Sequence, residues 1–255
     1  MQILYHSIAL FKRSFLKLIR TPILLFFSLV QPLMFLLLFT QLFNRFSTVP
    51  GFPAESYLLF SLPGIILMNA FSSSFQSGLS IVNDIQTGFL ERMLTTPINR
   101  MAIPLGRLLT DSVRMILQSS VIIFVAYLMG ATIKTGFLGI CLILVTVAAF
   151  GLAWSGISQI IALRTKNSEV VFGLGAFLTF PLIFTSTSLT PEAFMPEWMQ
   201  FVSKLNPISY TVEALRVLTI SGFDWNIIGQ AYLVIGIIGI ITIGGSVFLF
   251  KKVIE

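Results

Sequence analysis

Ionisable side chains are scarce in this chain, and their densest internal group lies between residues 84 and 111. Its members are Asp84, Glu91, Arg92, Arg100, Arg107 and Asp111. Charges that border long apolar segments can dock a soluble partner, lie among lipid headgroups, or carry protons and ions. The residues around these charges distinguish between the three roles.

Glu91 and Arg92 fall among apolar residues, so a helix here would carry apolar and ionic surface together. The apolar neighbours are Phe89, Leu90, Met93 and Leu94. Gly88 permits a turn before this helix, and Pro97 disfavours helical dihedrals at Thr96. We therefore expect a short helix within about residues 84–100, which either lies in the headgroup layer or docks into a groove of a soluble partner.

The sequence lacks the combinations of side chains that common enzyme active sites require. Its one histidine, His6, and its one cysteine, Cys141, cannot assemble a zinc site or a serine–histidine pair. No lysine follows a glycine, so the phosphate-binding loop Gly-x-x-x-x-Gly-Lys-[Ser/Thr] is absent. We expect no catalytic residue, cofactor or metal in this chain, and its energy must come from another polypeptide or an ion gradient.

An ion-gradient carrier usually places acids at mid-membrane depth. Asp111 is the one candidate for such a role, and it lies near one end of an apolar run. Arg114, three residues later, can neutralise it on the same helical face. We favour a paired structural anchor, with a proton relay as the alternative.

The rest of the chain has the composition of an integral membrane protein. Of its residues 56% are hydrophobic and 10% are charged, with mean hydropathy +0.94, whereas soluble domains are about 25% charged. Six apolar runs each reach the roughly 20 residues that cross a bilayer as a helix. They cover residues 22–43, 57–82, 108–131, 135–163, 170–189 and 225–250. Because a sheet or barrel does not fit this pattern, we predict an all-α protein with six transmembrane helices.

Residues 1–21 form a separate amphipathic segment ahead of the transmembrane domain at 22–255. Lys12, Arg13, Lys17 and Arg20 lie among apolar residues, and the last three follow helical spacing. Such a helix would lie on the anionic cytoplasmic leaflet. With both termini in the cytoplasm, lysine and arginine concentrate on the inner side, as the positive-inside rule requires.

The outer segment at about 190–219 contains three possible helix starts, at Thr190-Pro191-Glu192, Met195-Pro196-Glu197 and Asn206-Pro207. We expect short helices that dip into the outer leaflet, with Trp198 at headgroup level. Glu213 and Arg216 are spaced to form an ion pair. A simple external cap is the alternative.

Polar residues within the spans allow two interpretations. Gln31, Ser73, Gln76 and Ser77 either line a pathway or make hydrogen bonds between helices, and the sequence leaves both open. The glycines of the last span, Gly236, Gly239, Gly244 and Gly245, are interpreted as a close-packing surface.

Three motifs together resemble a known family. They are Thr-Gly-Phe-Leu-Glu-Arg-Met-Leu-Thr-Thr-Pro-Ile-Asn-Arg at 87–100, Gly-Arg-Leu-Leu-Thr-Asp at 106–111 and Leu-Asn-Pro-Ile-Ser-Tyr-Thr-Val-Glu-Ala-Leu-Arg at 205–216. In their sequence and order, these motifs resemble those of the membrane subunit of type-2 ABC exporters, and the resemblance covers essentially the whole chain. The nearest branch is the daunorubicin-resistance permeases. Gln86 is a departure, since these proteins often carry a charged residue there.

The resemblance implies a permease that works as a homodimer, or with a similar permease, in the plasma membrane with two separate ATPase subunits that bind ATP and Mg²⁺. It assigns residues 1–21 to an interface helix and spans two and five to the pathway. It assigns ATPase coupling to Gly88, Glu91, Arg92, Leu94, Thr96, Pro97 and Arg100. It assigns the external gate to Pro191, Trp198, Asn206, Pro207, Glu213 and Arg216. The implied cargo is an amphipathic drug or lipid, with a lipid-linked glycan as the alternative and an ion-gradient carrier as the rival mechanism; no nucleic acid is expected.

Overall fold

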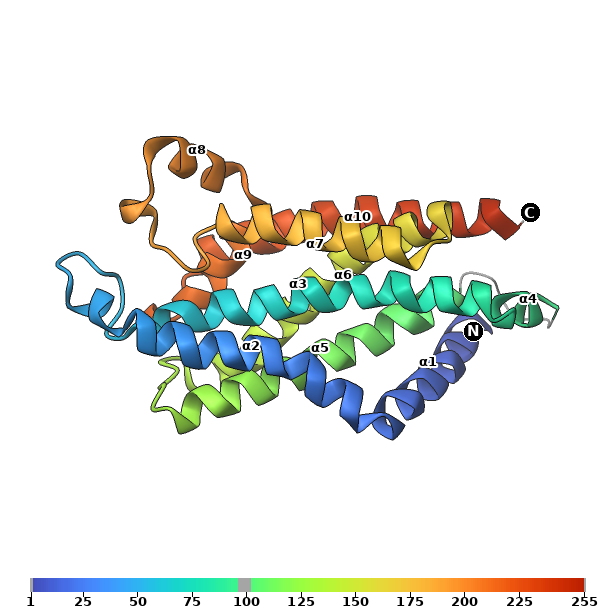
Figure 1. Ribbon diagram of the computed structural model, residues 1–255, viewed down its shortest axis with the longest axis horizontal. Coiled ribbons are helices and arrows are strands. Elements are labelled where there is room, and N and C mark those ends of the chain that lie inside the picture. The colour runs from blue at the N-terminus through green and yellow to red at the C-terminus, as the bar shows by residue number, and fades with distance from the viewer. Residues whose placement is uncertain (1, 96–101, 255) are drawn as a thin grey trace.

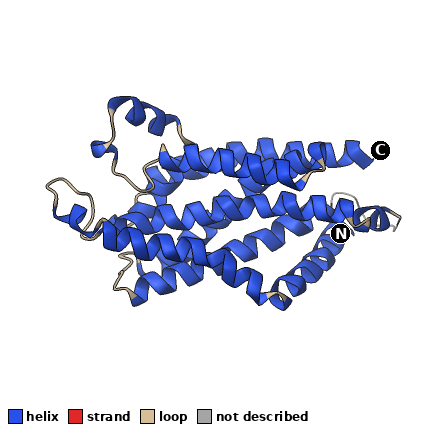
Figure 2. Ribbon diagram, viewed as in Figure 1, coloured by secondary structure: helices blue, strands red, loops and turns tan. Residues whose placement is uncertain are grey.

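The computed structural model describes residues 2–95 and 102–254, and within these ranges every regular element is a helix (Figure 2). In chain order they are α1 (Gln2–Arg20), α2 (Pro22–Leu42), η1 (Asn44–Thr48), α3 (Tyr57–Gln86), α4 (Phe89–Leu94), α5 (Ala102–Leu128), α6 (Gly136–Thr165), α7 (Ser168–Phe184), η2 (Glu192–Phe194), α8 (Glu197–Leu205), α9 (Pro207–Arg216), η3 (Val217–Ser221) and α10 (Trp225–Ile254). The all-α prediction is confirmed for this part of the chain.

In the described part of the chain, five helices are long and apolar enough to cross a membrane, namely α2, α3, α5, α6 and α10. The fifth predicted span corresponds to α7, which has only 17 residues and ends at Phe184. At about 1.5 Å per residue it covers roughly 25 Å, somewhat less than the hydrocarbon core. The six-span arrangement as a whole therefore stays a prediction.

Helix α3 forms the centre of the bundle: 94% of its most apolar 18-residue stretch is buried, against 11% of the corresponding stretch of α2. Glycines allow neighbouring backbones to approach it closely. A Cβ on Gly78 would lie 2.3 Å from Ser158 Oγ on α6, and a Cβ on Gly64 would lie 2.3 Å from the carbonyl oxygen of Ser188. The hydroxyl of Ser158 fills the space at Gly78, since it accepts from Gly78 N at 2.8 Å.

The glycines of α10 do not form the single packing surface that the sequence suggested. Gly239 and Gly245 face Ala153 and Ile160 of α6, whereas added Cβ atoms on Gly236 and Gly244 would meet nothing within 4 Å. At 100° per residue, the four positions are distributed around the helix. The prediction was wrong for two of the four glycines.

The two ends of the bundle carry different elements (Figure 1). Both chain termini and α4 lie at one end, where α1 crosses obliquely and packs against α5. The α1 backbone comes close enough that a Cβ on Gly106 would lie 2.9 Å from the carbonyl oxygen of Ser7. The segments η1, α8 and α9 lie at the opposite end.

Candidate functional site

Helix α4 is bounded and two-sided, as the sequence predicted. Gly88 precedes it in the left-handed conformation, with φ of 65°, which glycine adopts without a steric cost. Leu90 and Met93 are each 7% exposed, whereas Glu91 and Arg92 are exposed. The predicted coupling residues Thr96, Pro97 and Arg100, and the side chain of Leu94, lie outside the described residues.

The buried face of α4 belongs to a small hydrophobic cluster at the end of the bundle. Leu90 and Met93 join side chains from all the helices that end here: Ile81 and Val82 of α3, Ile103 of α5, Ala162 and Leu163 of α6, Val171 of α7 and Phe250 of α10. Because packed interiors have low compressibility, a displacement of α4 would be transmitted to the ends of these five helices. Glu91 and Arg92 remain free to meet a partner.

Helix α1 contacts α4 through a cation–π pair that the sequence did not indicate. The guanidinium of Arg13 lies over the ring of Phe89, 3.6 Å from its centroid, within cation–π range. Burial lowers the pKa of Arg13 from its ordinary value, but arginine stays charged at neutral pH. Lys12 and Arg20 are exposed on α1, and the side chain of Lys17 is outside the described residues.

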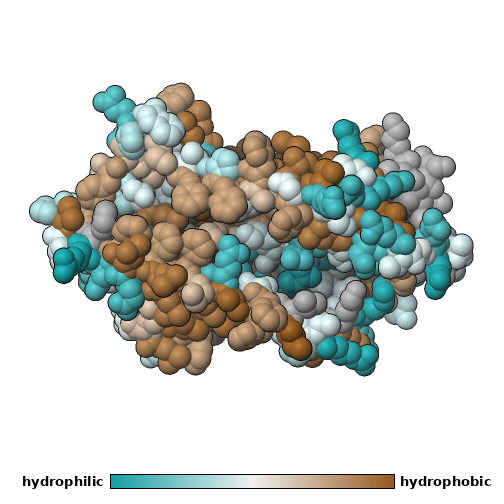
Figure 3. Space-filling model, in the orientation of Figure 1, coloured by the Kyte–Doolittle hydropathy of each residue, from teal (hydrophilic) through white to brown (hydrophobic). Residues whose placement is uncertain are grey.

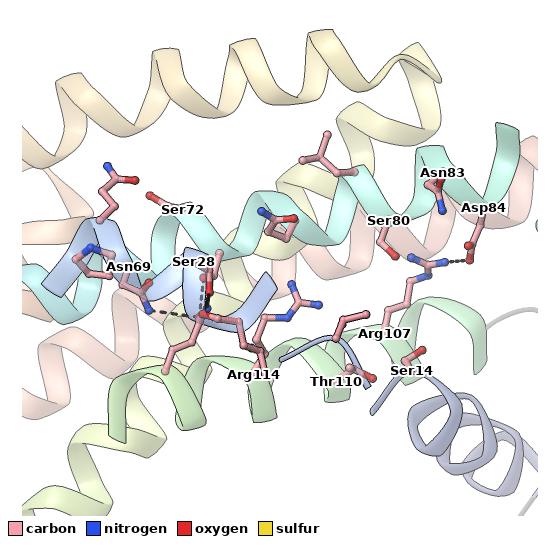
Figure 4. Close-up of a pocket in the computed structure, with 18 of the residues that line it drawn as sticks. Ser14, Ser28, Asn69, Ser72, Ser80, Asn83, Asp84, Arg107, Thr110 and Arg114 are labelled. Atoms are coloured by element: carbon pink, nitrogen blue, oxygen red, sulfur yellow. Dashed lines mark hydrogen bonds and ion pairs between the residues drawn. The ribbon is translucent and has the colours of Figure 1, made fainter. Parts of the chain in front are cut away.

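A polar hollow opens beside α3, between α1, α2 and α5, with a volume of about 570 Å³. Its polar lining consists of Arg13, Ser14, Thr21, Ser28, Gln31, Asn69, Ser72, Ser73, Gln76, Ser80, Asn83, Asp84, Arg107, Thr110, Arg114 and Gln118. Figure 3 shows hydrophilic residues near the middle of this face and toward the right-hand end, beside a largely apolar left part, and Figure 4 shows the lining side chains. Ser72, Gln76 and Asn83 form an exposed stripe on α3, which is mostly buried.

The structure divides the polar residues that the sequence proposed for a pathway. Gln31 and Gln76 line the polar hollow and are exposed. Ser73 lines it too, but its hydroxyl donates to Gln118 Oε1 at 2.8 Å. Ser77 instead accepts from Gln159 Nε2 of α6 at 3.0 Å and is buried. The hydrogen-bond interpretation is therefore confirmed for Ser73 and Ser77, and a pathway role for Gln31 and Gln76 stays a prediction.

Gln118 joins three helices, a role that the sequence analysis missed. From α5, its Nε2 donates to Ser28 Oγ of α2 at 2.7 Å, and its Oε1 accepts from Asn69 Nδ2 of α3 at 3.3 Å. A buried glutamine can satisfy both ends of its amide only where partners converge. The network forms the wall of the polar hollow (Figure 4).

Two ion pairs lie along α5. The predicted pair is present, with Arg114 Nη2 3.2 Å from Asp111 Oδ1. Arg107 pairs with Asp84 of α3, which the sequence analysis did not foresee. Arg107, Asp111 and Arg114 follow i, i+4, i+7 spacing, and this could have shown that they share one helical face. Asp111 is 3% exposed, and its Oδ2 has no hydrogen-bond partner among the described residues.

At the opposite end, Asn206 connects α9 to α7. Its Oδ1 accepts from Ile208 N at 2.9 Å, which confirms the predicted helix cap ahead of Pro207. Its Nδ2 donates to the carbonyl oxygen of Leu182 at 2.6 Å and to Thr185 Oγ1 at 3.1 Å. One buried side chain thus hydrogen-bonds a free backbone N–H at the start of α9 and a backbone carbonyl at the end of α7.

Arg216 anchors the same region to α3. It is 7% exposed, and its Nη1 pairs with Glu213 Oε1 at 2.5 Å, as the spacing predicted. Its Nη2 donates to the carbonyl oxygen of Thr187, and its guanidinium lies 3.9 Å from the ring centroid of Phe60. The segment after α7 is therefore held on α3.

Helix α8 stands apart from the bundle (Figure 1). Trp198, Phe201 and Leu205 are exposed and follow one face of α8, with Trp198 64% exposed, and Phe194 of η2 is exposed as well. Of the three predicted starts, Pro191 precedes only the one-turn η2, while Pro196 precedes α8. An apolar face of this kind suits the edge of a bilayer.

Comparison with known proteins agrees with this arrangement. The family model described as "ABC-2 type transporter" matches residues 5–220. The chain belongs to the ABC-2 type transporter family. Membership implies that this permease is a multi-pass membrane protein that works with an ABC ATPase.

Several curated ABC-2 permeases are similar to the chain. "Putative transport permease ycf38" of Cyanophora paradoxa is 31% identical, over 96% of this chain and 88% of that protein. "Daunorubicin resistance ABC transporter permease protein DrrB1" of Streptomyces coeruleorubidus is also 31% identical, over 77% and 69%. "Probable multidrug ABC transporter permease YbhR" of Escherichia coli K12 is 20% identical, over 78% and 54%.

Proposed function

We propose that this ABC-2 permease is the membrane subunit of an ATP-driven exporter in the plasma membrane, with both termini in the cytoplasm. Two copies of the chain would assemble with two ATPase subunits, and those subunits would bind ATP and Mg²⁺. The observation that carries the proposal is the placement of α4. Its buried residues are packed among the ends of five helices, while its charged residues face outward.

In the proposed mechanism, closure of the ATPase subunits presses on the exposed face of α4. Leu90 and Met93 transmit this displacement to the cluster formed by the ends of α3, α5, α6, α7 and α10. The contact between Arg13 and Phe89 moves α1 with them. The helices that enclose the polar hollow would then open it toward one side of the membrane and close it toward the other.

At the other end, Asn206 and Arg216 would hold the external gate. They fix the segment after α7 against α3 and α9, so that outward opening must move this segment as a unit. The exposed apolar face of α8 would rest in the outer leaflet. Spans two and five, α3 and α7, would line the pathway between the two copies.

An amphipathic cargo fits the polar hollow best. Its volume of about 570 Å³ lies within the roughly 300–1,000 Å³ of pockets that hold a drug-sized ligand. A lipid-linked glycan is the second candidate, favoured by the many hydroxyl and amide groups in the lining. An ion-gradient mechanism gains less support, because Asp111 is buried beside Arg114 and does not line the hollow.

The test is transport in proteoliposomes that contain the permease and its cognate ATPase. We expect ATP-dependent transport, and we expect Glu91→Ala or Pro97→Ala to reduce both transport and permease-stimulated ATP hydrolysis while membrane insertion stays normal. Glu55→Ala is the matched control, since Glu55 is exposed in the loop before α3, at the opposite end. Transport that needs a proton gradient and no ATPase would refute the proposal.

A further inference from the structure

The polar hollow extends along α3 from Asn69 to Asp84 (Figure 4), which is roughly 20 Å at 1.5 Å per residue. Asp84 lies at the end of the bundle that carries α1 and α4, and Asn69 lies deeper between the helices. A ligand in the hollow could thus have one part near the headgroup layer and another part within the membrane.

The charge of the hollow is basic. Arg13, Arg107 and Arg114 line it, and Asp84 is the one acid among its described lining residues. Asp111 lies behind Arg114 and pairs with it. Three guanidinium groups against two carboxylates leave one positive charge in excess. A cationic amphiphile would be repelled here, and an anionic one attracted.

The guanidinium of Arg114 has unused hydrogen-bonding capacity. Its side chain is 19% exposed, and its Nε is buried with no acceptor among the described residues. Figure 4 shows it projecting from α5 toward α3, into the polar hollow. A planar guanidinium with free N–H groups matches the geometry of phosphate oxygens.

The surroundings of Arg114 suit a phosphate that is attached to an apolar chain. Hydroxyl and amide groups of Ser72, Gln76 and Asn83 offer further donors along α3. Leu25, Met68 and Leu79 give the hollow apolar wall as well. Helix α2 closes one side, and its Phe26 and Phe27 are each 66% exposed, as expected of a surface against lipid.

We propose that the polar hollow binds the phosphate headgroup of an amphiphile, with Arg114 as its main anchor and the acyl chain directed toward α2. The site would accept phosphate-bearing lipids in preference to cationic drugs. If the proposed export function is correct, the bound amphiphile is the transported cargo, and this part of the proposal rests on that function. Binding of the amphiphile to the hollow does not depend on ATP.

The test measures binding of radiolabelled dodecyl phosphate to the full chain, purified with its ATPase in neutral maltoside micelles. We expect saturable binding that unlabelled dodecyl phosphate displaces and dodecyltrimethylammonium does not. Gln76→Glu places a negative charge at an exposed lining position and should weaken binding about tenfold or more, because repulsion between like unit charges about 4 Å apart corresponds to roughly fivefold in bulk water and roughly a thousandfold near a protein surface. Gln41→Glu, at the exposed far end of α2, is the matched control and should bind normally.

A second variant removes the guanidinium of Arg114 together with the carboxylate of Asp111, so that no buried charge is left unpaired. Arg114→Gln combined with Asp111→Asn should also lower the affinity about tenfold or more, with a melting temperature close to that of the unmodified protein. Equal affinity of the Gln76→Glu and Gln41→Glu proteins for dodecyl phosphate would show that it binds non-specifically at the protein surface, and would overturn the proposed site. Displacement by millimolar inorganic phosphate would assign the site to a free ion and overturn the amphiphile.

These results separate the two proposals. If dodecyl phosphate binds as expected but the chain never co-purifies with an ATPase, the export function fails and the site stands. If the ATPase is retained and stimulated but the charge variants bind normally, the site fails and the export function stands.

Discussion

Replacement of Leu90 by alanine should disconnect α4 from the helices it contacts. Leu90 is 7% exposed within the cluster at the end of the bundle. Truncation of a buried leucine costs about 2–5 kcal/mol in protein cores. This end of the molecule faces water in the proposed orientation, so the hydrophobic effect applies here as it does in a soluble protein.

The local consequence should be large because α4 has little stability of its own. It contains six residues, and isolated helices shorter than about 12 residues are marginal in water. A loss of even about 2–3 kcal/mol would raise the population of undocked α4 by roughly 30- to 150-fold. The rest of the bundle should be affected much less, since α3 keeps its contacts with α5, α6 and α7.

Hydrogen exchange and ATPase activity together measure this effect. In Leu90→Ala, backbone amides of residues 89–95 should exchange faster by a factor of this size, while those around Phe71 stay protected. Permease-stimulated ATP hydrolysis should fall in parallel. Leu42→Ala, at a leucine that is 73% exposed at the other end, is the control. Faster exchange in α4 with fully coupled turnover would refute the reasoning that α4 transmits force through this cluster.

Three further predictions concern packing and polar contacts. Asn206→Ala removes a helix cap and the donor to Leu182, and should cost about 2–4 kcal/mol; Asn206→Ser keeps a cap acceptor without adding a charge and should cost less in thermal unfolding. Gly64→Ala brings a Cβ to 2.3 Å from the carbonyl oxygen of Ser188 and should destabilise by about 1–3 kcal/mol, whereas Gly229→Ala, with nothing within 4 Å, should not lower the melting temperature. Arg107→Gln or Asp84→Asn alone leaves a partly buried charge unpaired, and each should lower the free energy of unfolding more than the double variant does. A double variant whose loss of stability equals the sum of the two single losses would contradict the pairing.

Local features of the structure were predictable because local rules determine them. The turn at Gly88 follows from the freedom of glycine at positive φ. The cap at Asn206 follows from its position before Pro207. The pairs Asp111–Arg114 and Glu213–Arg216 follow from i, i+3 spacing. Residues close in sequence carry enough information for each of these contacts.

Contacts between helices were not predictable in the same way. The pair Arg107–Asp84, the Gln118 network and the stacking of Arg13 on Phe89 depend on how helices distant in sequence are rotated and shifted against one another. The end of α7 at Phe184 is another such case. The carbonyl oxygen of Leu182 accepts a hydrogen bond from Asn206 Nδ2, and the segment after α7 crosses α3 at Gly64. The apolar run in the sequence continues to Leu189, and the predicted span therefore extended beyond the end of α7.

The most direct test of the central claim is photo-crosslinking from the exposed face of α4. A benzophenone amino acid at position 92, introduced into the full chain in cells together with its ATPase, should form an adduct with the ATPase, and the yield should change when ATP is trapped in the closed state. The same group at position 45, in η1 at the opposite end, should give none. Labelling of position 92 by a membrane-impermeant reagent added outside the cell, without an ATPase adduct, would contradict the account.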